Sequence, residues 1–137
     1  MLRLETRGRA RALQLLYAWE LQGAPPVHEM AAGLSRLTGP EPRVLDFAED
    51  LAGRVIANVD ALDRQAAVAA ENWRMSRIAV VERNILRLAI QELVDGTAPP
   101  KVAIDEAVRL AHWFGGAKAA PFVNGVLDRI AHSLGRL

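Results

Sequence analysis

The sequence of 137 residues has no cysteine, few aromatic residues and no long apolar run. Without cysteine, disulfide bonds and thiolate chemistry are excluded. Charged residues interrupt every apolar stretch well before the roughly 18 residues that a membrane-spanning helix needs. The first residues also lack the apolar stretch of a signal peptide, because Arg7, Gly8, Arg9 and Arg11 fall where it would run. We therefore expect a cytoplasmic protein with no membrane association.

Half of the residues are apolar, so the chain has enough apolar side chains for a core. Alanine, leucine, valine and arginine are abundant, and this mixture favours helices, because alanine and straight-chain residues lose little side-chain freedom there. A chain of this length suits one compact domain, which we assign to residues 1–137.

Clusters of glycine and proline divide the sequence into segments with helical periodicity. No alternation of period two persists, so no strand is predicted. Helices are expected over 6–22, 27–37, 43–70, 76–94, 101–113 and 120–134. The polar run at 71–77 favours a bend, with Ser76 as a candidate N-cap of the helix that runs from there to 94. The predicted fold is all-α, with six helices, or seven if 43–75 is broken.

No pattern in the sequence predicts catalysis, a metal site or a cofactor. The three histidines are widely spaced and none belongs to an HExxH motif. Glu82 and the pair Asp105–Glu106 have no companion nucleophile, and carboxylates on amphipathic helices are usually solvated or salt-bridged. Gly115 and Gly116 lie between two predicted helices. This position favours a role in capping the C-terminus of the first of them, and phosphate binding is the alternative.

Positive charge is concentrated at the start of the chain. Residues 1–11 hold four arginines and one glutamate, a net of +3, so the remainder carries −2 of the chain's total of +1. Arg3, Arg7 and Arg11 share one helical stripe with Gln14, while Arg9 either flanks it or belongs to an extended start. Arginine donates two parallel hydrogen bonds to a phosphate and keeps its charge, so this stripe predicts RNA binding. The alternative is that the arginines only make the terminus soluble.

Aromatic residues flank the glycine pair, where unstacked bases could lie on them. Phe114 precedes the glycines beside Lys118 and is the better stacking candidate. Phe122 follows them, but it aligns with Val126 and other expected core positions, so we expect it to be at least partly buried.

Three stretches together resemble the NusB family of bacterial antitermination factors. They are RGRARALQLLYAWELQG at 7–23, ERNILRLAIQEL at 82–93 and PKVAIDEAVRLAHWFGGAKAAPFVNGVLDRI at 100–130. The third is the most specific, because KVAIDEAV, FGG and FVNGVLD occur there at the family's spacing. The resemblance covers almost the whole chain, and only 24–75 matches poorly.

The resemblance implies two small helical bundles packed roughly perpendicular. It also implies transcription antitermination through boxA, a short single-stranded RNA element in ribosomal RNA leader transcripts. Family members bind boxA jointly with the ribosomal protein NusE, and the pair joins NusA, NusG and RNA polymerase. A homodimer stays open as a further state, because certain relatives self-associate.

Carried onto this chain, the resemblance implies an RNA surface and a NusE surface. The RNA surface would comprise Arg3, Arg7, Arg9, Arg11, Phe114, Gly115, Gly116, Lys118, Phe122 and Asn124. The NusE surface would comprise Tyr17, Glu82 and Arg87. Bland alternatives stay open: the Asn124 amide could tie its helix to the preceding loop, Tyr17 could be partly core, and Glu82 and Arg87 could be ordinary surface charges.

Two departures from the family pattern concern the RNA contacts. The arginines are more dispersed than in relatives, and position 118, often acidic in relatives, is lysine here.

Two other functions are also considered. One is a helical scaffold that binds protein only. The other is a ribosomal RNA cytosine methyltransferase, in which NusB-like domains occur at the N-terminus; without a Rossmann-like segment, this sequence would be only a fragment of such an enzyme.

Overall fold

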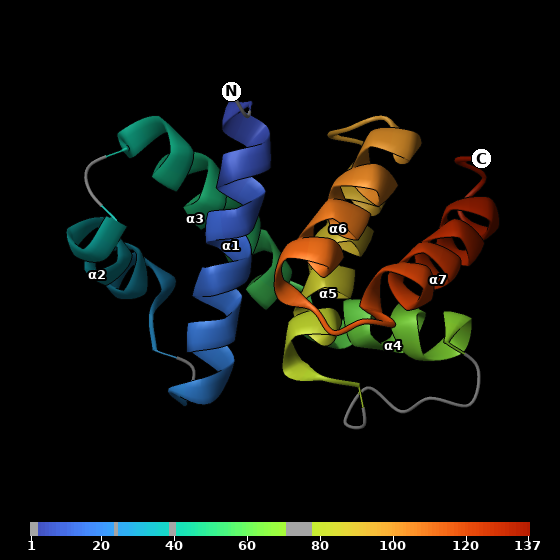
Figure 1. The fold of residues 1–137 in the computed structure, drawn as a ribbon, viewed down its shortest axis with the longest axis horizontal. Helices are drawn as coiled ribbons and strands as arrows, with labels where there is room; N and C mark the ends of the chain where they lie inside the picture. The colour runs from blue at the N-terminus through green and yellow to red at the C-terminus, as the bar shows by residue number, and fades with distance from the viewer. Residues whose placement is uncertain (1–2, 24, 39–40, 71–77) are drawn as a thin grey trace. The chain divides into compact units, whose positions relative to one another are not determined.

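The computed structural model describes residues 3–23, 25–38, 41–70 and 78–137, and every regular element among them is helical. Seven helices are present in these ranges (Figure 1): α1 (Leu4–Leu21), α2 (Val27–Thr38), α3 (Pro42–Ala57), α4 (Val59–Ala69), α5 (Val80–Asp95), α6 (Pro100–Phe114) and α7 (Ala119–Ser133). The all-α prediction is confirmed. The helices divide into two compact units, Met1–Ala57 and Asn58–Leu137.

The first unit consists of α1, α2 and α3, with α1 packed along α3. Its core contains Leu13, Leu15 and Leu16 of α1 with Leu51 and Val55 of α3, all 3% exposed or less. The two helices approach closely at Gly8, where a Cβ atom would lie 2.4 Å from Cδ1 of Phe47. A residue without a side chain is therefore needed at this point of α1.

The second unit is built around α5, in which the sequence places one apolar stripe at Val81, Ile85 and Leu88 and a second at Leu86, Ile90 and Leu93. All ten residues from Asn84 to Leu93 are buried, and α4, α6 and α7 each pack against this helix. Helix α5 ends at Gly96, whose left-handed conformation (φ 67°) is favourable only for glycine among common residues. Its backbone N–H donates to the Glu92 carbonyl at 2.9 Å.

The predicted helix 43–70 is wrong as one element, because the structure has a break at Asn58 between α3 and α4. Asn58 leaves the helical conformation (φ −118°, ψ 15°), and its side-chain amide donates to Gln91 Oε1 at 3.2 Å. Asparagine is a weak helix former, and this hydrogen bond ties its side chain to α5, so the helix breaks here without glycine or proline. The predicted bend at 71–77 and the N-cap Ser76 lie outside the described residues.

The apolar spacing within 120–134 predicts that Leu134 points inward, but it is 37% exposed at the C-cap of α7, which ends at Ser133. None of the described helices combines the length and apolar character that crossing a bilayer requires.

Candidate nucleic-acid interface

Three of the predicted arginines lie on the accessible part of the first unit. Arg3 is exposed and is the N-cap of α1. One turn later, Arg7 forms an ion pair with Glu41, and both side chains are partly exposed. Arg11 donates to Gln14 Oε1 at 3.0 Å. The helical stripe predicted for these side chains is therefore present, with one of its three charges paired to a carboxylate.

Arg9 lies inside this unit and is only 6% exposed. Its guanidinium carbon lies 5.8 Å from the centre of the Phe47 ring, within the range of a cation–π contact. Since α1 is helical from Leu4, the extended start considered for Arg9 is not what the structure has. Burial favours a packing role for Arg9, and its contact with RNA stays a prediction.

In the second unit, the glycine pair forms the turn between α6 and α7. Gly115 caps α6, and its N–H donates to the Ala111 carbonyl at 2.9 Å, so the predicted C-terminal cap is confirmed. A Cβ atom at Gly115 would lie 2.5 Å from Cβ of Ala119. At Gly116 no described atom lies within 4 Å of such a Cβ. The first glycine is required by packing, and the second is open to solvent.

A groove of about 420 Å³ adjoins this turn and brings together four predicted site residues. It is lined by Ile78, Ala79, Glu82, Gly116, Lys118, Ala119 and Phe122. Phe122 is partly buried, as predicted. Glu82, assigned to the protein partner from the sequence, here shares a groove with residues assigned to RNA. Sequence reasoning missed Ile78 and Ala79, which fall between the matched stretches and belong to no motif.

Two aromatic side chains at the end of α6 are accessible. Trp113 is 45% and Phe114 43% exposed, and their rings meet edge to face with centres 6.3 Å apart. The guanidinium of Arg109 lies 5.8 Å from the Trp113 ring centre. Phe114 thus has the exposure that base stacking requires.

Asn124 is exposed on α7 and makes no side-chain hydrogen bond to any residue in the described ranges. The alternative in which its amide ties the helix to the loop is therefore not observed. Its amide is available to a ligand, as the RNA prediction requires.

The three residues predicted to contact a protein partner differ in accessibility. Tyr17 is 42% exposed on α1, so part of it is accessible to a partner. Arg87 is 6% exposed and binds Asp63 through two hydrogen bonds of 2.7 and 2.8 Å. Its third nitrogen donates to Asn84 Oδ1 at 2.9 Å. Arg87 is therefore no ordinary surface charge, and that alternative is wrong for this residue.

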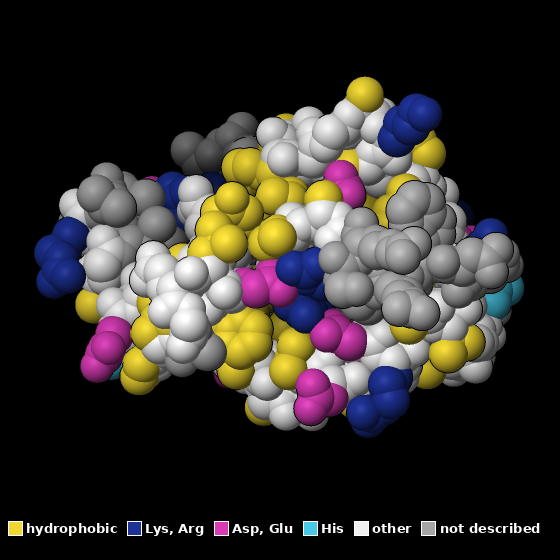
Figure 2. Space-filling model, turned by 90° about the horizontal axis from the view of Figure 1, so that it is seen from below, with side chains coloured by type: hydrophobic (Ala, Val, Ile, Leu, Met, Phe, Trp, Pro, Cys, Tyr) yellow, Lys and Arg dark blue, Asp and Glu magenta, His cyan; other side chains and the backbone are white. Residues whose placement is uncertain are grey.

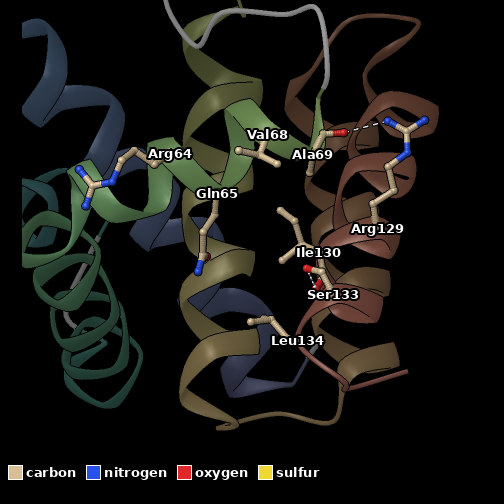
Figure 3. Close-up of a pocket in the computed structure, with 8 residues that line it drawn as sticks. All are labelled: Arg64, Gln65, Val68, Ala69, Arg129, Ile130, Ser133 and Leu134. Carbon is tan, nitrogen blue, oxygen red and sulfur yellow. Dashed lines mark hydrogen bonds between the residues drawn. The ribbon is translucent and has the colours of Figure 1, made fainter.

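A second groove, of about 480 Å³, lies between α4 and α7 and contains none of the predicted site residues. Val68, Ile130 and Leu134 give it an apolar wall, and Arg129 donates to the Ala69 carbonyl at its edge (Figure 3). Within the described ranges, no three His, Asp or Glu side chains are grouped to hold a metal ion. On the face seen in Figure 2, basic and acidic side chains are interspersed.

Comparison with known proteins identifies close relatives over nearly the full length. A family model described as the NusB family matches residues 6–132. The transcription antitermination protein NusB of Sorangium cellulosum (strain So ce56) is 40% identical over 131 residues, covering 95% of this chain and 93% of its own. A solved structure of T. maritima NusB superimposes with a TM-score of 0.82 and 29% identity, covering 96% and 93% of the two chains. A crystal structure of the antitermination factors NusB and NusE in complex with double-stranded RNA matches with a TM-score of 0.84 and 26% identity, covering 97% and 99%.

Proposed function

Because this chain belongs to the NusB family, we propose that it is a transcription antitermination factor that binds boxA RNA of ribosomal RNA transcripts together with NusE. The similarity to relatives named as antitermination proteins supports the process. The similar complex of NusB and NusE with RNA supports the two partners. In this role the chain binds and does not catalyse, works in the cytoplasm, and joins NusA, NusG and RNA polymerase.

The observation that carries the proposal is the α6–α7 turn. There an exposed aromatic ring, two glycines and a lysine adjoin a groove whose wall includes Phe122. Single-stranded RNA is read through unstacked bases held against such aromatic rings. Phe114 and Phe122 would hold bases, while Lys118 would neutralise a phosphate.

The arginines of α1 would supply attraction that is independent of sequence. Contacts to phosphates position a nucleic acid but carry no base information. If about four phosphates are neutralised, log K against log salt should have a slope near −3 for a single strand. Arg3, Arg7 and Arg11 are the accessible donors for this role. Tyr17 and the neighbourhood of Glu82 and Arg87 would face NusE.

The test is a fluorescence anisotropy titration of a labelled single-stranded RNA carrying boxA, with and without NusE. A scrambled RNA and a double-stranded RNA of equal length serve as controls. We expect preference for boxA over the scrambled strand and tighter binding with NusE present. Absence of RNA binding under both conditions would instead support the scaffold that binds protein only, and equal affinity for boxA and scrambled RNA would contradict recognition of boxA.

The division of roles is tested with two variants. Replacing Arg7 and Arg11 by alanine should weaken binding of all RNAs alike, because only phosphate contacts are lost. Phe114→Ala should weaken binding of boxA by about 5- to 150-fold if one stacked base worth roughly 1–3 kcal/mol is lost, and should also reduce the ratio of affinities for boxA and scrambled RNA. An equal loss of preference in both variants would contradict this division.

A further inference from the structure

Arg7 is a predicted RNA-binding arginine that already has an anionic partner. Its guanidinium binds the Glu41 carboxylate, 34 residues away in sequence. The two side chains are 39% and 37% exposed, so RNA can reach either. A carboxylate and a phosphate accept hydrogen bonds from the same N–H groups of a guanidinium, so the two anions compete for it.

Packing of the first unit fixes both halves of this pair. Arg7 precedes Gly8, where α1 approaches α3 closely. Glu41 precedes α3, and its carbonyl accepts the N–H of Leu45 at 3.0 Å, so its backbone is held at the start of the helix. The pair therefore follows from how the two helices pack.

We propose that Glu41 acts as a built-in competitor for RNA phosphates at Arg7 and so lowers the affinity of the first unit for any RNA. This inference rests on the proposed RNA-binding function and adds a residue that the resemblance does not assign. RNA must displace the carboxylate to use Arg7, and Glu41 then leaves a negative charge near the bound phosphate. Sequence-independent binding is weakened, while base recognition elsewhere is unaffected, because phosphate contacts do not read sequence.

The experiment is the same anisotropy titration, on the full chain, with Glu41→Gln. The variant keeps the side-chain size and removes the charge. Partly exposed ion pairs contribute at most modestly, so we expect a gain in affinity of about two- to fivefold, equal for boxA and scrambled RNA. The slope of log K against log salt should steepen by about 0.7, as for one further neutralised phosphate. Glu41→Ser, which places a favoured N-cap residue there, should give the same gain.

Two controls show whether the effect passes through Arg7. Glu41→Gln in an Arg7→Ala background should change RNA affinity little, because the competed group is gone. Asp46→Asn removes one negative charge from the exposed side of the same helix and should have a smaller effect than Glu41→Gln. Thermal unfolding of each variant checks that the fold is kept.

The outcomes separate this inference from the function on which it rests. If the unmodified chain binds RNA but Glu41→Gln and Glu41→Ser bind no tighter, the competition is refuted and the proposed function stands. A gain of the same size in the Arg7→Ala background also refutes it, because the effect is then one of general charge. If the unmodified chain binds no RNA with NusE present, both fail.

Discussion

Asp63 and Arg87 belong to neighbouring helices of the second unit and form a two-pronged ion pair. Arg87 is almost fully buried, whereas the Asp63 side chain is 28% exposed. Removing one member of such a pair is costly, because the other charge stays buried without a counter-charge. This pair therefore links α4 to α5, and loss of either member leaves the other charge unpaired.

Asp63→Asn should lower the free energy of unfolding by about 3 kcal/mol, at the lower end of the range for buried pairs because Asp63 is partly solvated. The matched control is Asp105→Asn, which changes an exposed carboxylate on α6 and should alter the free energy of unfolding by less than about 0.5 kcal/mol. Urea unfolding followed by circular dichroism measures both. Equal stability of the two variants would show that the pair contributes nothing.

Several properties of single residues were beyond sequence reasoning. The arginine stripe was predicted, but burial of Arg9 under Phe47 depends on a residue 38 positions away. The pairing of Arg7 with Glu41 depends likewise on the packing of α1 against α3. Burial of Arg87 was also missed, because an arginine within an amphipathic pattern normally indicates the solvated face.

At the scale of helices, α1 is constrained by its approach to α3. Alanine normally stabilises a helix relative to glycine by about 0.5–1 kcal/mol. At Gly8, however, the new Cβ would lie 2.4 Å from the Phe47 ring, so Gly8→Ala should destabilise the chain by about 1–3 kcal/mol. Gly53→Ala on α3, where no described atom lies within 4 Å, should be neutral or stabilising. Urea unfolding of the two variants compares them directly.

The turn between α6 and α7 gives a second pair of glycines for comparison. Gly115→Ala should displace residues 114–118, because its Cβ would meet both Ala119 and, at 2.8 Å, the Ala111 carbonyl oxygen. We expect lower stability and a smaller ratio of affinities for boxA and scrambled RNA. Gly116→Ala has open space around the new Cβ atom and should retain the stability. A retained ratio in Gly115→Ala would mean that the turn does not read bases.

Element positions followed closely from glycine and proline breaks and from the spacing of apolar residues. The predicted helices at 27–37, 101–113 and 120–134 agree with the structure to within one residue at either end. The break at Asn58 was missed at its position, because it depends on a hydrogen bond to Gln91 on another helix. Local sequence patterns carry no information about such a partner.

At the scale of the whole molecule, RNA and NusE should bind cooperatively if both bind this chain. Coupling between two ligands is reciprocal, so the factor by which NusE raises RNA affinity must equal the factor by which RNA raises NusE affinity. We expect a factor between about 5 and 150. Titrations of each ligand with the other absent and saturating give both factors. A factor of one would mean that the partners bind independently.

Family membership and the all-α fold could be derived from the sequence because motifs and periodicity are local. The two compact units were implied only by the resemblance, since no linker composition separates 57 from 58. The groove beside Phe122 could be found only from the structure, because it combines residues at the start of α5 with residues that follow α6 in the sequence.

The most direct test of the account is to map the protein residues that touch RNA. A boxA RNA carrying 4-thiouridine would be bound with NusE, irradiated, and the cross-linked peptides identified by mass spectrometry. The account predicts adducts within residues 3–11 and within 113–122. Adducts confined to other segments, such as the α4–α7 groove at 64–69 and 129–134, would contradict it.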